Sequence, residues 1–228
     1  MSQCVLSTAR LTLMPLSFDH LDHVIRLDST PDVVRYVENG RPLTTAEATI
    51  AHNRRLDAAK RATGLGHWAG FLDGQYSPID ETGSSDPTIG EFVGWWSLAP
   101  IDGEGSDSND PIPLQADLGY RLLPRFWRRG LATEGARELV RHGFEELGLA
   151  RISAETMAVN VASRATMAAA GLRYVRTFHV VFENPIAGTE EGEVEYAITR
   201  EEWLAARQAA VEGEAGSAIS TERLATVS

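Results

Sequence analysis

A short basic glycine loop in the middle of the chain has the residue types and spacing of a phosphate-binding site. A strand-like run over 116–123 leads into Arg128, Arg129 and Gly130, and a long amphipathic pattern begins at Leu131. A helix that starts there would point its free backbone N–H groups at an anion, and the two arginines can add charge-assisted hydrogen bonds. The pattern also suits a plain strand–helix junction in which the glycine only makes a turn, and the local sequence favours neither interpretation.

Other kinds of catalytic site find little support in the sequence. The sole cysteine, Cys4, lies outside any motif, and no Gly-x-Ser-x-Gly elbow provides a serine nucleophile. The glycine loop lacks the Gly-Lys-Ser/Thr ending of a nucleotide hydrolase. His20 and His23 share a helical face but have no carboxylate or cysteine partner for a metal. We therefore expect no metal site, and we expect the six histidines to lie at the surface.

The loop and the start of the helix carry a longer pattern. In chain order it consists of Trp127, Gly130, Ala132, Thr133 and Glu134. This pattern, Trp-x-x-Gly-x-Ala-Thr-Glu, resembles the acyl-CoA signature of the GNAT N-acetyltransferase superfamily, in particular its ribosomal-protein N-terminal acetyltransferase branch. Arg128 stands where many members carry glycine. The resemblance extends in order and spacing from about Leu6 to Ile198.

The resemblance implies an acetyl-CoA-dependent N-acetyltransferase that acts by direct attack in a ternary complex. The acceptor would be a primary amine, either a protein N-terminus or a small amine, and acetyl-CoA would be the co-substrate. A non-catalytic module that senses acyl-CoA is the alternative. The residues implied to bind the cofactor, by side chain or backbone, are Leu122, Leu123, Arg128, Arg129, Gly130, Leu131, Ala132, Thr133, Asn160 and Arg164. The N–H group of Leu122 or Leu123 is expected to meet the oxyanion.

Asp117 and Ser163 are the residues that the resemblance implies for proton transfer. Asp117 stands where relatives in this branch commonly have a glutamate general base, and its shorter side chain favours a role through water. Ser163 belongs to the family's Asn-x-x-Ser motif and would donate to the departing thiolate, since Met167 occupies the position of the usual tyrosine acid. The local pattern also allows a strand-edge carboxylate and an ordinary first-turn serine.

Hydrophobic periodicity and the resemblance predict a mixed α/β (α+β) domain. Helices would flank a largely antiparallel central sheet of about six to seven strands with splayed middle strands. The expected strands cover 11–13, 66–72, 89–98, 115–123, 150–157, 171–180 and 192–198. The expected helices begin near Ser17, Pro31, Thr44, Leu131, Asn160 and Glu201. Trp95 and Trp96 must point to opposite faces of their strand, so we expect at most one of them in the core.

Composition limits the partners and the compartment. The 228 residues include 21 Lys plus Arg against 32 Asp plus Glu, a formal charge of −11 that argues against nucleic-acid binding. With no membrane-length apolar run and no signal-peptide core, we expect a cytoplasmic protein without a membrane partner. We expect one acyltransferase domain over 1–211 and a loose tail over 212–228, while a homodimer stays open. Acidic loops over 73–88 and 99–113 favour a cationic acceptor or serve solubility alone.

Overall fold

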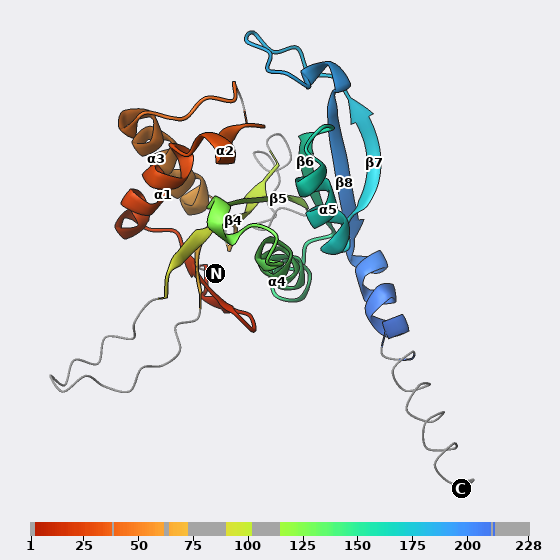
Figure 1. Cartoon of the computed structure of the whole chain (residues 1–228). Coiled ribbons are helices and arrows are strands. Elements are labelled where there is room, and N and C mark those ends of the chain that lie inside the picture. The colour runs from red at the N-terminus through yellow and green to blue at the C-terminus, as the bar shows by residue number, and fades with distance from the viewer. Residues whose placement is uncertain are drawn as a thin grey trace, which may run out of the picture.

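Eight strands form one mixed sheet in the computed structural model of the chain, in the order β1-β2-β3-β4-β5-β6-β8-β7 (Figure 1). The structure describes residues 3–37, 39–61, 64–72, 90–101, 115–210 and 212, so the acidic loops and the tail lie largely outside the described residues. The strands are β1 (Leu6–Ser7), β2 (Leu11–Pro15), β3 (Gly66–Leu72), β4 (Phe92–Pro100), β5 (Gln115–Leu122), β6 (Arg151–Met157), β7 (Arg173–Phe178) and β8 (Glu193–Thr199). The helices are α1 (Leu21–Asp28), α2 (Pro31–Val34), α3 (Thr45–Arg61), α4 (Leu131–Glu145) and α5 (Val161–Ala169), and 200–210 is also helical.

The mixed, largely antiparallel sheet is confirmed, with one strand more than expected. The additional strand is β1, which has two residues and pairs with β2. A strand this short has no detectable alternation of apolar and polar residues, so the sequence pattern could not reveal it.

The two middle strands, β5 and β6, part from one another. They run parallel, and their register joins three residue pairs, of which Asp117↔Ser153 is the last. Beyond that pair, β5 continues along β4 to Leu122, and β6 continues along β8 to Met157. A gap therefore opens between the carboxyl ends of two parallel strands, and the expected splay is confirmed.

Helices cover both faces of the sheet, as the adjacent tryptophans of β4 demonstrate. Trp96 is fully buried against α4, where its indole N–H donates to the Ala132 carbonyl at 3.1 Å. Trp95 is buried on the opposite face, where the guanidinium of Arg55 on α3 lies 5.1 Å from its ring centroid. The expectation that at most one tryptophan lies in the core is wrong, because α3 covers the second face of the strand.

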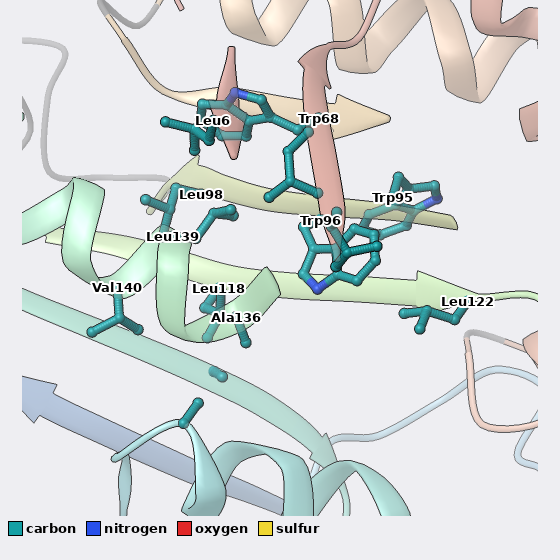
Figure 2. Close-up of a cluster of buried hydrophobic side chains, with 14 of the residues drawn as sticks. Leu6, Trp68, Trp95, Trp96, Leu98, Leu118, Leu122, Ala136, Leu139 and Val140 are labelled. Atoms are coloured by element: carbon teal, nitrogen blue, oxygen red, sulfur yellow. The ribbon is translucent and has the colours of Figure 1, made fainter. Parts of the chain in front are cut away.

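Helix α4 packs its apolar stripe onto β4 and β5. Its buried positions follow the predicted spacing and include Ala136, Leu139, Val140, Gly143 and Phe144. Figure 2 shows Leu139 near Leu98 of β4 and Ala136 near Leu118 of β5. Gly135 permits the close approach, since a Cβ atom there would lie 2.5 Å from the Trp96 ring. The start of α4 is thereby held at the end of β5.

Three of the histidines are buried, so the expectation of surface positions is wrong for them. The exposed fractions of His20, His52 and His142 are 7%, 0% and 4%. His20 Nδ1 accepts from the Ser17 N–H at 3.1 Å, and His52 Nε2 lies 3.0 Å from the Ser17 carbonyl oxygen. A neutral imidazole can be buried at modest cost when a backbone group partners it, as in His20 and His52, and such burial leaves no sign in the sequence pattern.

Candidate functional site

Alternation along β5 places two polar side chains on opposite faces of the sheet beside the gap. Asp117 shares a face with Arg121, which reaches Asp28 of α1 at 2.9 Å. Tyr120 lies on the other face, where it contacts Ser163 of α5. A reactant held in the gap would therefore meet Asp117 from one face and the two hydroxyl groups from the other.

Asp117 is a largely buried carboxyl group with no hydrogen-bond partner among the described residues. Its parallel partner on β6 is the buried Ser153, and Glu155 follows two residues later on the same face. Burial, together with the negative charge of Glu155, raises the pKa of Asp117 to about 7. This carboxyl group therefore gains and loses its proton near neutral pH, as a general base requires.

Ser163 lies near the start of α5, which follows directly after β6. Asn160 caps this helix as predicted, since its Oδ1 accepts from the Ser163 N–H at 3.2 Å. Asn160 Nδ2 also donates to Thr156 Oγ1 on β6 at 3.0 Å. From β5, the Tyr120 hydroxyl lies 3.0 Å from Ser163 Oγ and 3.0 Å from the Ser163 carbonyl oxygen. The structure thus brings Asn160 and Ser163 together with Tyr120.

Tyr120 was not predicted as a site residue, although the sequence carries a signal for it. Period-2 alternation from Asp117 already places Tyr120 on the opposite face, beside the helices that follow β5 and β6. What the pattern could not supply was the contact itself, which joins residues 43 apart in the chain.

Two residues with left-handed backbone conformation shape the loop between β5 and α4. Gly130 has φ of 76° and Arg128 has φ of 57°, in the region that favours glycine. This explains why glycine suits position 128 in the resembling family. Glu134 is the first residue whose N–H bonds within the helix, to Gly130 O at 3.0 Å, which leaves the N–H groups of 131–133 open. These N–H groups and the exposed side chains of Arg128 and Arg129 fit a diphosphate.

Leu122 and Leu123 differ in the direction of their N–H groups. The Leu123 N–H donates to the Val93 carbonyl on β4 at 2.9 Å and is therefore already engaged. Because these groups alternate along an antiparallel strand, the Leu122 N–H points away from β4, toward the gap. The Leu122 carbonyl accepts from the Trp127 indole at 2.7 Å, which ties the loop to the end of the strand. Of the two, Leu122 is better placed to donate to an anion in the gap.

A cavity of about 560 Å³ lies beside the loop. It is lined by Thr8, Arg10, Gly130, Thr133, Glu134, Arg137, Glu138 and Arg141. Arg10, in the turn between β1 and β2, donates to the Arg129 carbonyl at 2.9 Å and pairs with Glu134 at 2.5 Å. Arg164 lies apart from this cavity and donates to the Ala158 carbonyl at 2.9 Å. The cavity therefore adjoins the loop, whereas Asp117 and Ser163 do not line it.

The polar groups at the gap are a carboxyl, two hydroxyls and backbone N–H groups, which can hold protons and bind anions. Within the described ranges, no three or more His, Cys, Asp or Glu side chains are grouped to hold a metal ion. Over the same part of the chain, no helix is long and apolar enough to cross a membrane.

Comparison with known proteins gives matches along most of the chain. Residues 10–173 match the acetyltransferase (GNAT) domain family. The chain is 44% identical over 206 residues to the FsC-acetyl coenzyme A-N(2)-transacetylase of Aspergillus fumigatus, covering 89% of this chain and 79% of that protein. It is 27% identical over 162 residues to the uncharacterized N-acetyltransferase p20 of Bacillus licheniformis, covering 69% of this chain and 76% of that protein.

Solved structures share the fold at lower identity. A GNAT-family acetyltransferase from Bacillus anthracis has a TM-score of 0.64 at 22% identity, covering 87% of this chain and 99% of that one. The ribosomal L7/L12 alpha-N-protein acetyltransferase RimL, solved with coenzyme A, has a TM-score of 0.65 at 15% identity, covering 86% of this chain and 98% of that one. These structures share the fold, and the family match and the Aspergillus relative establish that the chain belongs to the GNAT family and is an acetyl-CoA-dependent N-acetyltransferase.

Proposed function

We propose that this acetyltransferase moves the acetyl group to a primary amine by direct attack in a ternary complex, with Asp117 as the general base. The proposal rests on the environment of Asp117, at the point where β5 and β6 part. This residue is largely buried, it has no hydrogen-bond partner among the described residues, and its pKa is raised to about 7. In slightly alkaline solution its carboxylate form is ready to take a proton from an ammonium group, directly or through one water.

The proposed reaction balances in protons and in electron pairs. Acetyl-CoA supplies the acetyl group as a thioester. Asp117 removes one proton from the ammonium group, and the nitrogen lone pair forms the C–N bond while the carbonyl electrons move onto oxygen, to which the Leu122 N–H donates. As the C=O bond re-forms, the C–S bond breaks and its electron pair stays on sulfur, toward which the Ser163 hydroxyl donates. The nitrogen loses its second proton to solvent and the thiolate takes one from solvent, which gives an amide, a thiol and one net proton.

The same proposal assigns cofactor binding to the loop and the start of α4. The N–H groups of 131–133, Arg128 and Arg129 would hold the diphosphate. Arg129 suits this role because it has no carboxylate partner among the described residues, and its guanidinium carbon lies 5.6 Å from the Phe126 ring centroid. Asn160 and Arg164 would contribute indirectly, since their contacts with Thr156 and Ala158 fix α5 against the end of β6.

We infer that the acceptor is cationic before it reacts. Glu155 and Glu193 extend the negative charge beyond Asp117, and neither has an ion-pair partner among the described residues. Burial raises the pKa of both carboxyl groups, and neighbouring carboxylates raise it further. Arg176 and Arg151 offset part of the charge of Glu155, and an ammonium group would offset more of the negative charge. The name of the Aspergillus relative specifies transfer to a nitrogen designated N2, which is consistent with an amine acceptor.

The test of the proposal measures the release of free CoA thiol with a panel of primary amines. Asp117→Asn should lower kcat/KM by about 100-fold or more, while the Kd for acetyl-CoA by calorimetry stays unchanged. Asp32→Asn, an exposed carboxylate on α2, is the matched control and should keep full activity. Arg129→Ala and Gly130→Val should instead weaken acetyl-CoA binding. Wild-type turnover by Asp117→Asn at pH 8 would remove Asp117 from the role of base.

A further inference from the structure

The hydroxyl of Tyr120 has two acceptors at equal distance on one residue, namely Oγ and the carbonyl oxygen of Ser163, both at 3.0 Å. We propose that Tyr120 is a positioning residue that orients the Ser163 hydroxyl toward the leaving sulfur, an inference that rests on the proposed function of Ser163. Tyr120 belongs to β5, and Ser163 belongs to the helix that follows β6. Their contact therefore bridges the two strands that part.

The number of protons on the two hydroxyl groups explains how this contact works. A tyrosine hydroxyl carries one proton and can also accept a hydrogen bond. When Ser163 donates to Tyr120, the tyrosine proton can go to the Ser163 carbonyl. When Ser163 turns its proton toward sulfur, Tyr120 can donate to Ser163 Oγ instead. This exchange rotates only the two hydroxyl groups, and Ser163 keeps a partner throughout in a half-buried place, where an unpaired polar atom is unfavourable.

The backbone of Ser163 is held independently of its hydroxyl. Asn160 accepts from the Ser163 N–H at 3.2 Å and donates to Thr156 Oγ1 of β6 at 3.0 Å. Strand β6 thus fixes where the serine lies, and β5, through Tyr120, fixes where its hydroxyl points. The Tyr120 ring packs against the hydrophobic core, so Tyr120→Phe removes the hydroxyl contact and leaves the ring packing in place.

The Tyr120 hydroxyl already bonds to Ser163, so we expect its effect on the leaving group to pass through that residue. Burial raises the pKa of Tyr120 to about 12, despite its hydrogen bonds with Ser163 and with Thr166. An ordinary thiol has a pKa of about 8.5, and a serine hydroxyl is a weaker acid than a tyrosine hydroxyl. A thiolate therefore takes a proton from neither residue, and both act on it by hydrogen bonding. Tyr120 therefore keeps its proton through the reaction, and its effect on the leaving group passes through Ser163.

A double-mutant cycle tests this coupling, with wild type, Tyr120→Phe, Ser163→Ala and the double variant. In the wild-type background, Tyr120→Phe should lower kcat about fivefold to tenfold, as expected for one lost hydrogen bond. The KM and the calorimetric Kd for acetyl-CoA should stay within about twofold. In the Ser163→Ala background, the same substitution should change kcat by less than about twofold. Tyr174→Phe, which removes an exposed hydroxyl on β7, is the matched control and should keep wild-type kcat.

Several outcomes would overturn the inference. A purely structural role would lower kcat by the same factor in both backgrounds and would move the pH midpoint that Asp117 sets. Unchanged kcat in Tyr120→Phe, or in Ser163→Ala, would equally remove the positioning role. Failure of the proposed function is recognised separately, because the response to Asp117→Asn reports the general base whatever happens at Ser163.

Discussion

The carboxylate of Asp28 on α1 and the guanidinium of Arg121 on β5 form an ion pair at 2.9 Å, in which the carboxylate has no solvent exposure. The second carboxylate oxygen accepts from Arg55 of α3 at 2.8 Å. Both guanidinium groups also lie about 5 Å from the Trp95 ring centroid, at 5.1 Å for Arg55 and 5.2 Å for Arg121. This cluster fastens α1 and α3 to the face of β5 that carries Asp117, so charge as well as apolar packing holds the cover over that face.

Loss of the Asp28 carboxylate should destabilise the fold. Asp28→Ala removes the group that two partly buried guanidiniums share, and it should lower the free energy of unfolding by about 3–5 kcal/mol. Urea unfolding monitored by tryptophan fluorescence measures the change. Asp32→Ala on α2, an exposed position, should shift it by less than about 0.5 kcal/mol. Equal stability of Asp28→Ala and wild type would show that the cluster does not hold the helices.

The activity should depend on pH through Asp117. The proposed general base acts as its carboxylate, and burial raises its pKa to about 7, so kcat/KM should rise as pH increases and reach half its maximum near pH 7. The measurement is a pH–rate profile between pH 5 and pH 9, about two units on each side of the midpoint. In Asp117→Asn this limb should vanish. A profile flat from pH 5.5 upward would contradict the assignment, because an ordinary carboxyl group is already ionised there, about one unit or more above its pKa.

Ionisation of Asp117 should also cost stability. The pKa of Asp117 in the folded state lies above the ordinary value of 3.8. The stability that its protonated form contributes is therefore fully present below pH 3.8 and is lost as the pH rises through about 7. Between pH 5 and pH 9 the wild type should therefore lose on the order of 2–4 kcal/mol relative to Asp117→Asn. Unfolding free energies at the two pH values, compared between the two proteins, give this difference. Parallel pH dependence of the two proteins would mean that the carboxyl group is not shifted.

The loop should gain backbone stability and lose affinity in Arg128→Gly. Position 128 has φ of 57°, and an L-residue there costs about 1–2 kcal/mol relative to glycine. The variant should unfold at higher urea concentration, while its Kd for acetyl-CoA rises because the proposed diphosphate site has lost one cation. Arg125→Gly, just before the loop, is the comparison, since its backbone φ is not positive and glycine brings no such relief. Tighter acetyl-CoA binding by Arg128→Gly would contradict the role of the arginine.

Replacing His142 by leucine should stabilise the protein. Both ring nitrogens of His142 are buried without a hydrogen-bond partner among the described residues. Burial lowers the pKa of His142 below its ordinary value of 6.5, and Arg141 lowers it further. The stability that the neutral imidazole contributes is therefore present above pH 6.5 and is lost as the pH falls below that value. His142→Leu should therefore raise the free energy of unfolding by about 1 kcal/mol at pH 8, and by more at pH 5.5. A larger gain at pH 8 than at pH 5.5 would contradict this account.

Much of the fold could be predicted because its signals are local. The apolar period of α4 named its buried face, and the splay of β5 and β6 followed from the resemblance to the family. The side chains of Thr44 and Glu47 predicted the start of α3, where the Thr44 N–H donates to Glu47 at 2.8 Å. The patterns of α3 and α4 depend on residues a few positions apart, and the splay was predicted from a motif that identifies a family and therefore its fold.

The predictions that were wrong, for the tryptophans and the histidines, share a different cause. Both tryptophans of β4 are buried because α3 covers one face and α4 the other, and a strand pattern cannot say how many faces are covered. The buried histidines depend on the same packing, since a neutral imidazole is compatible with either environment. Burial of polar and amphipathic side chains is decided by what packs above them, and that comes from elsewhere in the chain.

The sequence by itself determined the family, the cofactor, the glycine loop and the position of Asp117 on the central strand. Only the tertiary structure decided that Tyr120 meets Ser163 across the gap, and that Asp28 binds Arg121 from a position 93 residues away. The reason is physical: periodicity reports which side of its own element a residue occupies, within one turn or one strand. Which element then packs against that side, and so how far a carboxyl group is buried and what its pKa becomes, is settled only when the helices close over the sheet.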